Sequence, residues 1–203
     1  MSELGPAVHA SENTSAGVAT LSDIVPADID AFVRYWHAGV ADLEFLGIDP
    51  VLLGTPDDTR QRFRCAIRSG DPSQRSIAFA IKVDGALVGY TLLNRYTPEI
   101  NYSHWHITEP RLRASGISTA LYPHRIKTYF DAAAMKRLIH QTRTRNVGVN
   151  RMLDKYVAIA ETCYVARPDG VAGPGDFHLR YVYPRDVPEF FKRAVALRRS
   201  TAH

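Results

Sequence analysis

The sequence predicts an α/β protein that forms a single domain after a disordered start. A β-hairpin gives the plainest pattern, because two strand-like runs at 77–83 and 86–93 flank the dipeptide Asp84-Gly85, which favours a two-residue hairpin turn. Further along, residues 102–108 form an aromatic, strand-like run that leads into a turn of small residues and then a helical pattern. The 203 residues, of which 45% are hydrophobic and 23% are charged, are enough to bury one substantial core.

Before the hairpin, two helices are expected on either side of an irregular stretch. Residues 1–17 are rich in Ser, Ala, Gly and Glu, which predicts disorder, so the domain is expected to span residues 18–203. Hydrophobic periodicity then predicts a short strand at 18–21, a helix at 27–37, an irregular and partly apolar loop at 41–54, a helix at 56–67 and a break at 70–73.

After the turn, helical and strand patterns alternate. They predict, in order, a helix that reaches about residue 134, a strand at 137–142, a helix from 147 to about 158, strands at 162–167 and 178–182, and an amphipathic helix at 187–198. The succession shows no internal repeat and no second domain. The last helix could either cap the sheet or form a contact in a homodimer.

Composition argues against several classes of protein and site. No apolar run approaches the roughly 20 residues of a membrane span, and residues 1–17 lack the apolar segment of a secretion signal, so we expect a cytoplasmic protein. Cys65 and Cys163 have no metal-ligand spacing, which predicts reduced structural thiols and no bound metal. The net charge of +4 comes from scattered basic residues with clusters at 140–145 and 192–199, and such clusters usually form a solvated face.

The segment from Arg111 to Ser118 predicts a phosphate-binding turn. Small residues at 114–116 and at 118 would let an anionic ligand approach the main chain, and Arg111 and Arg113 add positive charge. The first amides of the following helix lack partners inside the helix and lie at its positive end, which suits a pyrophosphate. The segment has neither the three spaced glycines of a dinucleotide-binding turn nor the Gly-Lys-Ser/Thr of a P-loop.

Residues Arg113-Ala-Ser-Gly-Ile-Ser118 resemble the Gln/Arg-x-x-Gly-x-Gly/Ala signature of the GNAT superfamily of acyl-CoA-dependent N-acyltransferases. Ser118 departs from the usual Gly or Ala, but it is also small. The order of the predicted elements from about Leu21 to Tyr183 is similar to the GNAT succession. The resemblance implies a GNAT fold, with a single mixed central sheet of about six to seven strands that is splayed in the middle and flanked by helices on both faces.

The resemblance also implies a co-substrate and its site. Acetyl-CoA or another acyl-CoA would place its pantetheine arm where two strands splay, and the acyl carbonyl would accept a main-chain N–H from the region of Ile107 and Thr108. Asn146 matches an asparagine that helps to hold the pantetheine chain. The residues expected to bind the co-substrate are Ile107, Thr108, Arg111, Arg113, Ala114, Ser115, Gly116, Ile117, Ser118, Thr119 and Asn146.

Two histidines of the 102–108 run could supply a general base. Strand alternation puts Tyr102, His104 and His106 on one face, and counted back from Arg113, His104 occupies the position of a working histidine in the arylalkylamine N-acetyltransferases of the superfamily. A neutral imidazole could accept the proton of an alkylammonium group, whose pKa is about 10. His104 is therefore the candidate base, whereas His106 is expected to be a half-buried strand residue.

A tyrosine in the helix after the next strand would be the acid that protonates the leaving thiolate. Members of the family often carry this tyrosine seven residues after an asparagine, and from Asn146 that position is Leu153. Tyr156 lies one turn further on and could reach the same face. Tyr156 is therefore the candidate acid, although an aromatic residue at helical spacing is more often part of a core.

Three functions remain open. The first is transfer of an acetyl or other acyl group to a small-molecule primary amine, in a pocket lined by the first two helices, the 41–54 loop and the aromatic residues Tyr35, Trp36 and Tyr102. The second is a catalytically silent acyl-CoA-binding or regulatory module, which Ser118 and Leu153 would suit. The third is nucleic-acid binding through basic stretches such as 192–199, and it is the least favoured.

Overall fold

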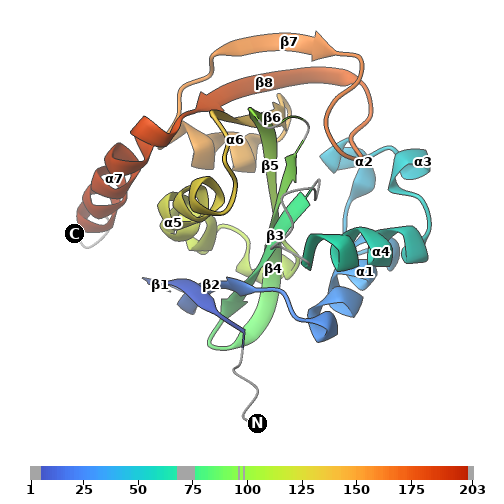
Figure 1. The fold of residues 1–203 in the computed structure, drawn as a ribbon, viewed down its shortest axis with the longest axis horizontal. Coiled ribbons are helices and arrows are strands. Elements are labelled where there is room, and N and C mark those ends of the chain that lie inside the picture. The colour runs from blue at the N-terminus through green and yellow to red at the C-terminus, as the bar shows by residue number, and fades with distance from the viewer. Residues whose placement is uncertain (1–5, 68–75, 96, 98, 201–203) are drawn as a thin grey trace.

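The computed structural model describes residues 6–67, 76–95, 97 and 99–200, and these residues form one eight-stranded sheet with helices on both faces (Figure 1). The strands are β1 (Val8–Thr14), β2 (Gly17–Asp23), β3 (Ser76–Val83), β4 (Ala86–Arg95), β5 (Ile100–Ile107), β6 (Arg137–Arg143), β7 (Glu161–Val165) and β8 (Gly175–Val182). The helices are α1 (Ile29–His37), α2 (Leu43–Leu46), α3 (Pro50–Leu53), α4 (Pro56–Ile67), α5 (Ile117–Ala132), α6 (Val147–Asp154) and α7 (Val187–Ser200).

The sheet divides into two halves between β5 and β6. Its strand order is β1-β2-β3-β4-β5-β6-β8-β7, and all neighbours are antiparallel except β5 and β6. The parallel pairing covers only Ile100–Tyr102 against Arg137–Ile139. Beyond it, β5 continues to Ile107 beside β4, and β6 continues to Arg143 beside β8. The two strands therefore separate after Tyr102, which confirms the predicted splay in a mixed sheet.

Each face of the sheet buries its own apolar cluster, because successive strand residues point to opposite faces. On one face, α5, α6 and α7 cover strand residues such as Leu21, Phe79 and Leu138, and α7 caps this face through Phe190 and Ala194. On the other face, α1 and α4 pack against the strands through residues that include Phe32, Trp36, Phe63 and Tyr90. Figure 1 shows α5 and α7 on one side of the strands and α1 and α4 on the other.

The predicted hairpin is confirmed as β3 and β4. Asp84 and Gly85 connect the strands, with φ angles of 48° and 82°. Positive φ at both central residues is what a turn matching the twist of the flanking strands requires, and Asp-Gly adopts it readily.

The prediction of disorder for residues 1–17 is wrong for Val8–Thr14. These residues form β1, which pairs antiparallel with β2 and raises the strand count to eight. Glu12 fixes β1 to the helices, because its carboxylate lies 2.8 Å from His124 Nε2 on α5 and also pairs with Arg198 on α7. These partners lie more than 100 positions away, so local composition does not reveal them. Residues 1–5 lie outside the described residues.

The 41–54 stretch is more regular than predicted, because it contains α2 and α3. Asp42 caps α2 by accepting the Phe45 amide at 2.9 Å, and Asp49 caps α3 by accepting the Val51 amide at 2.8 Å. Side-chain caps of this kind stabilise even single-turn helices. The predicted break at 70–73 lies outside the described residues.

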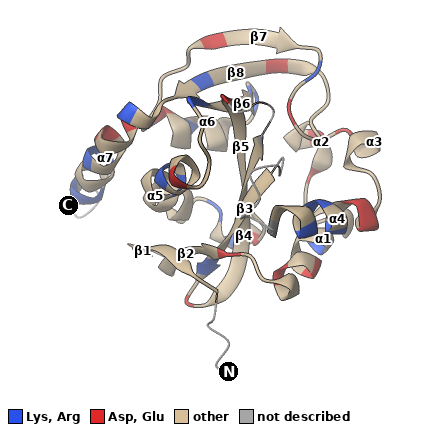
Figure 2. Cartoon of the chain, in the orientation of Figure 1, with Lys and Arg blue, Asp and Glu red and all other residues tan. Residues whose placement is uncertain are grey.

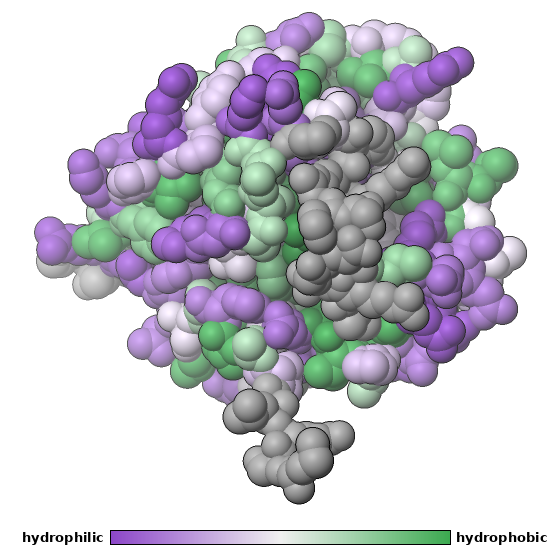
Figure 3. Space-filling view, in the orientation of Figure 1, coloured by the Kyte–Doolittle hydropathy of each residue, from purple (hydrophilic) through white to green (hydrophobic). Residues whose placement is uncertain are grey.

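Charged and apolar side chains are distributed differently over the surface. Basic residues outnumber acidic ones on α4 and α7 (Figure 2), and some of them form pairs, such as Arg60 with Asp57 and Arg193 with Glu189. Apolar side chains are exposed on the α2–α3 segment, at Phe45, Val51 and Leu52 (Figure 3). Among the helices of the described part of the chain, none combines the length and the apolarity that a membrane span requires.

Candidate active site

The splay leaves main-chain groups of β5 without a strand partner. The Thr108 N–H donates to the Val88 carbonyl at 2.9 Å. Along an antiparallel pair, successive residues of a strand direct their N–H groups alternately toward the partner strand and away from it. The N–H groups of Ile107 and Trp105 therefore point away from β4 and toward the side that β6 has left. The predicted carbonyl-binding role is therefore wrong for Thr108, whose amide is used within the sheet. For Ile107 it stays a prediction.

The 113–119 turn presents main-chain amides at the start of α5. Gly116 is the N-cap residue with φ of 85°, and Ala114 also has a positive φ of 65°. The first helical bond runs from the Ala120 N–H to the Gly116 carbonyl, so the amides of residues 117–119 have no acceptor inside the helix. Ser118 lies inside α5 at negative φ. Serine is therefore compatible with a position where the signature has Gly or Ala.

Other contacts brace this turn. The Ser115 amide and hydroxyl both donate to the Leu112 carbonyl, at 3.4 and 2.6 Å, and Ser15 Oγ donates to the Ser115 carbonyl at 2.9 Å. Ser115 is thus bonded within the turn, and the β1–β2 connection supports it. Arg113 Nε donates to the Ile107 carbonyl at 3.4 Å, and Arg111 is exposed beside Glu109. Arg113 is thus bonded to the end of β5, and Arg111 is paired with an acidic residue of the same connection.

Asn146 and Tyr156, which flank α6 and were predicted to be site residues, both make contacts that stabilise the fold. Asn146 is the N-cap of α6 and accepts the Val149 amide at 3.3 Å. Tyr156 is 2% exposed, its hydroxyl donates to the Thr119 carbonyl at 2.8 Å, and its ring stacks on Tyr122 with centroids 4.5 Å apart. Burial raises the pKa of Tyr156 to about 12. These contacts are typical of a core residue, and its role as an acid stays a prediction.

A cavity of about 870 Å³ lies where α1–α4, the splay, the start of α6 and the β7–β8 loop meet. Asn146 and Val149 at the start of α6 and Trp36 of α1 are among its lining residues. Tyr35 and Tyr102, also predicted to contact the acceptor, are not lining residues. The apolar and aromatic part of the wall includes Leu46, Ile48, Leu52, Leu53, Phe63, Tyr90, Leu92, Val171, Ala172 and Phe177, and polar or charged residues such as Asp58, Gln61, Arg62, Asn94 and Gln141 line the rest. One continuous space therefore connects the splay with the chamber between α1–α4 and the β7–β8 loop.

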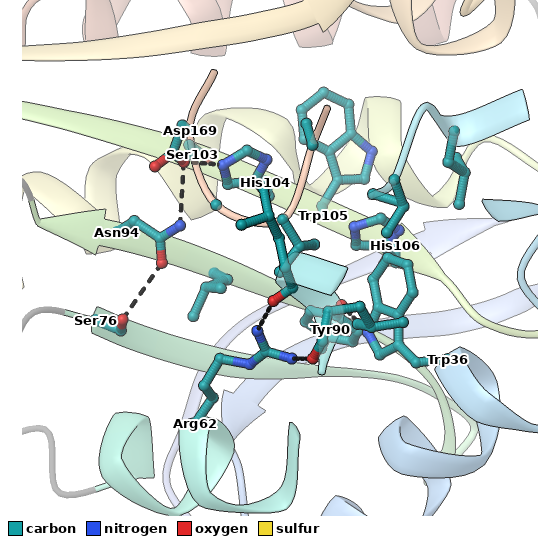
Figure 4. A pocket seen from close by; sticks show the side chains of 18 of the residues that line it. Trp36, Arg62, Ser76, Tyr90, Asn94, Ser103, His104, Trp105, His106 and Asp169 are labelled. Carbon is teal, nitrogen blue, oxygen red and sulfur yellow. Dashed lines mark hydrogen bonds and ion pairs between the residues drawn. The ribbon is translucent and has the colours of Figure 1, made fainter. Parts of the chain in front are cut away.

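His104 lies in the wall of this cavity and pairs with Asp169, a residue of the β7–β8 loop (Figure 4). The bond joins His104 Nε2 and Asp169 Oδ2; the His104 side chain is 25% exposed and that of Asp169 is fully buried. Asn94 Nδ2 donates to the same Asp169 oxygen at 3.0 Å. Asp169 was not predicted from the sequence, because this residue lies 65 positions from His104 and its local Asp-Gly pattern indicates only a turn.

His106 has a different environment from His104, two residues away on the same face. Its ring packs against Trp36 and Tyr90 with centroids 4.8 and 5.2 Å away, and Tyr35 Oη lies 3.3 Å from its Nδ1. Burial, with smaller contributions from His104 and Arg113, lowers the pKa of His106 to about 3. His106 is therefore neutral at physiological pH and belongs to the aromatic packing.

Arg143 holds three walls of the cavity together. Its guanidinium donates to the carbonyls of Gly47 at 3.1 Å, Gly173 at 2.7 Å and Pro174 at 2.8 Å. Main-chain bonds also join the α2–α3 segment to the β7–β8 loop, including Asp49 N–H to the Val171 carbonyl at 2.9 Å. The expectation of a solvated basic face at 140–145 is wrong here, because these bonds use Arg143 and because His140 is fully buried.

Metal ligation has no support in the residues that the structure describes. Among them, no three His, Cys, Asp or Glu side chains gather in a way that could hold a metal ion. Cys65 and Cys163 are both free thiols.

Comparison with known proteins finds likeness in structure only. No family model and no curated protein matches the sequence. RimJ from Mycobacterium smegmatis in complex with CoA-disulfide has a TM-score of 0.71 and 20% identity over 95% of both chains. RimL, a ribosomal L7/L12 alpha-N-protein acetyltransferase in complex with coenzyme A, has a TM-score of 0.69 and 13% identity over 87% of this chain and 98% of its own. An acetyltransferase of the GNAT family from Bacillus anthracis has a TM-score of 0.61 and 16% identity over 87% and 98%. The chain therefore has the GNAT fold.

Proposed function

We propose that the protein is an N-acyltransferase that moves an acetyl or other acyl group from a coenzyme A thioester to a primary amine. The observation that carries the proposal is the splay between β5 and β6. It places outward-facing main-chain amides of β5 beside one continuous cavity, with His104 in the cavity wall. A helix N-terminus with unpaired amides follows the same strand. These are the parts that a thioester with a diphosphate-bearing carrier requires.

The co-substrate would bind mainly to the main chain. The amides of residues 117–119, at the positive end of α5, would hold the diphosphate, with Arg113 as a nearby counter-charge. The Ile107 N–H would donate to the acyl carbonyl and stabilise the negative charge that develops on its oxygen during attack. Bound acyl-CoA supplies the activated acyl group.

His104 would accept the proton of the attacking amine. An alkylammonium has a pKa of about 10, so forming the free amine at pH 7 costs on the order of 4 kcal/mol. The His104 ring is partly exposed at the cavity wall, so a bound amine or an intervening water can reach it. The leaving thiol has an ordinary pKa of about 8.5, which allows departure as the thiolate without a dedicated acid.

The acceptor in this proposal is a small molecule with an apolar body. The cavity volume of about 870 Å³ is within the range of small-ligand sites, about 300–1,000 Å³. The apolar and aromatic part of its wall, which includes Trp36 and Tyr90, suits an aryl or alkyl group next to the amine. The alternative acceptor is the N-terminus of a protein, the substrate that the name of RimL indicates for that enzyme.

Binding and turnover test this proposal separately. Acetyl-CoA at a hundredfold excess over its Kd should stabilise the fold by about 2.7 kcal/mol, measured by thermal shift. Release of free thiol is then followed with arylalkylamines, alkylamines, polyamines and short peptides. Faster turnover of arylalkylamines than of peptides supports a small-molecule acceptor, and the reverse order supports a protein acceptor. Absence of both stabilisation and turnover would contradict acyl transfer.

A silent acyl-CoA-binding module is the second candidate. Leu153 is fully buried at the position where the family often has its acid, and the Tyr156 hydroxyl is bonded to the main chain. Stabilisation by acyl-CoA without acylation of any amine in the panel would favour this candidate. Nucleic-acid binding is disfavoured, because Lys192 and Arg193 of α7 pair with Glu189 and because Arg198 pairs with Glu12 of β1.

A further inference from the structure

We infer that Asp169 is a positioning residue for His104, which keeps the imidazole proton on Nε2 and leaves Nδ1 as the atom that accepts the proton of the amine. The inference rests on the proposed function, in which His104 is the base. It adds a second residue, from a loop distant in sequence, and it assigns the reacting nitrogen.

The hydrogen bond between the two side chains determines the tautomer. An ionised carboxylate can only accept hydrogen bonds, so the bond from His104 Nε2 to Asp169 Oδ2 needs its hydrogen on Nε2. A neutral imidazole carries one N–H, and its other nitrogen then has a free lone pair. Figure 4 shows that the second ring nitrogen of His104 lies on the far side of the ring from Asp169. Nδ1 is therefore the basic atom.

The protein holds the Asp169 carboxylate in place. Its side chain is fully buried, Asn94 Nδ2 donates to Oδ2 at 3.0 Å, and the Asp169 main-chain N–H donates to Gln141 Oε1 at 2.7 Å. The next residue, Gly170, has φ of +68°, a conformation that glycine adopts without strain. A carboxylate fixed so closely to the ring stabilises the imidazolium that forms when His104 takes a proton.

The other titratable groups near His104 do not compete with this carboxylate. His106 faces it from its own strand and His140 faces it from β6, and burial lowers the pKa of both imidazoles, so both are neutral at physiological pH. Tyr102 interacts electrostatically with Asp169, and its pKa is raised by burial, so it is also neutral. Asp169 is therefore the charged group among these neighbours of His104.

The reaction step balances with these two residues. The amine nitrogen forms the C–N bond to the acyl carbon with its lone pair, and its proton passes to His104 Nδ1, directly or through a water. The C–S bond breaks and its electron pair stays on sulfur as the thiolate. The imidazolium, held by Asp169 through Nε2–H, then returns its proton to solvent.

The test measures the histidine itself, without reference to activity. Long-range ¹H–¹⁵N spectra of the full chain across pH 4–9, with His104 assigned by comparison with His104→Gln, report its tautomer and its pKa. In the wild type, the neutral ring should carry its proton on Nε2. In Asp169→Asn, the His104 pKa should fall by about 1 unit or more, because the charge that favours imidazolium is gone. Asp176→Asn, which changes an exposed carboxylate of β8, is the matched control and should change neither quantity.

Activity supplies a second readout. With an accepted amine, the acidic limb of kcat/KM should move to lower pH in Asp169→Asn by the same amount as the His104 pKa. The kcat value at pH 8 should fall at least about tenfold, because the weaker base accepts the proton less readily, while the Kd of acetyl-CoA should stay the same. A merely structural role of Asp169 would lower the amount of folded protein without moving the pH profile.

The outcomes separate this inference from the proposed function. A wild-type ring with its proton on Nδ1 overturns the inference, and that measurement needs no variant. An unchanged His104 pKa in folded Asp169→Asn overturns it as well, even if the enzyme is active. If the Nε2–H tautomer and the pKa change are found but no amine is acylated, the positioning of His104 by Asp169 holds and the acyltransferase proposal fails.

Discussion

The 113–119 turn and the cavity beside the splay are two halves of one candidate site, and they are built differently. The turn offers main-chain amides from consecutive residues, placed by the positive φ of Gly116 and by the start of α5. The cavity is lined by side chains from most of the fold and is held by bonds such as those of Arg143 to the α2–α3 segment and the β7–β8 loop. The turn therefore depends on local backbone geometry, and the cavity depends on tertiary contacts.

The same contrast recurs between His104 and His106. Both lie on one face of β5, and strand alternation describes them equally well. His104 meets a buried carboxylate from a loop 65 positions away, whereas His106 packs against aromatic residues of α1 and β4. Their different chemistry therefore comes from the elements that pack against the strand, and substitutions can separate the two halves of the site.

The largest expected effect is that of His104→Ala. Loss of a general base lowers kcat/KM by about 10²–10⁴, whereas the stabilisation by acetyl-CoA should persist, because the 113–119 turn does not include His104. Thiol release at saturating acetyl-CoA and thermal shift measure the two effects on the same protein. An equal loss of acetyl-CoA binding would show that the halves are not independent.

Arg143→Ala tests the long-range bonds that hold the cavity. The variant removes donors from the carbonyls of Gly47, Gly173 and Pro174, and water can replace only some of these bonds because the side chain is half-buried. We expect the free energy of unfolding in urea to fall by about 2–3 kcal/mol and the KM of the amine to rise more than the Kd of acetyl-CoA. Arg151→Ala, at an exposed position of α6, is the control and should change stability by no more than about 0.5 kcal/mol.

The same division explains what the sequence could predict. The Asp84-Gly85 hairpin and the small-residue turn before α5 could be predicted because each pattern lies within a few residues and has a local physical cause. His104 was singled out by its spacing from Arg113 in the GNAT signature, and its role as base stays a prediction. Strand β1 was missed, because its stabilising partners, His124 and Arg198, are on α5 and α7. Asp169 was missed for the same reason, since a turn dipeptide carries no information about the histidine that it will meet after folding.

The environment of His106 predicts a pH dependence of stability. Its pKa is about 3 in the folded protein and about 6.5 in an unfolded chain. Between these values the unfolded state binds more protons, so the free energy of unfolding should decrease as pH falls from about 6.5 toward 3, by up to about 1.4 kcal/mol per pH unit. Urea unfolding at pH 7, 6 and 5 measures this slope.

His106→Phe is the variant that isolates this contribution. It keeps an aromatic ring beside Trp36 and Tyr90 but removes the titrating group, so the slope between pH 6.5 and 5 should become shallower. Buried His140, whose pKa is also lowered, still contributes in the same direction, so some slope should remain. A slope identical to that of the wild type would mean that water reaches His106 and that its aromatic neighbours do not lower its pKa.

The smallest expected change in stability is that of Ser118→Asp, and this variant is informative because stability and acetyl-CoA binding should change in opposite directions. Ser118 is the second residue of α5, where a carboxylate interacts favourably with the positive helix end and should stabilise the free protein by about 0.5 kcal/mol. The same charge should repel a bound diphosphate and weaken acetyl-CoA binding at least about tenfold, or roughly 1.4 kcal/mol. Thermal unfolding with and without acetyl-CoA measures both effects, and Ser118→Ala, which introduces a residue typical of the signature, should preserve affinity.

A general defect in folding would lower both the stability and the affinity for acetyl-CoA. Only an anion site at this helix end makes the stability rise while the affinity falls. Unchanged acetyl-CoA affinity in Ser118→Asp would place the diphosphate elsewhere and would leave the turn as a connection between β5 and α5.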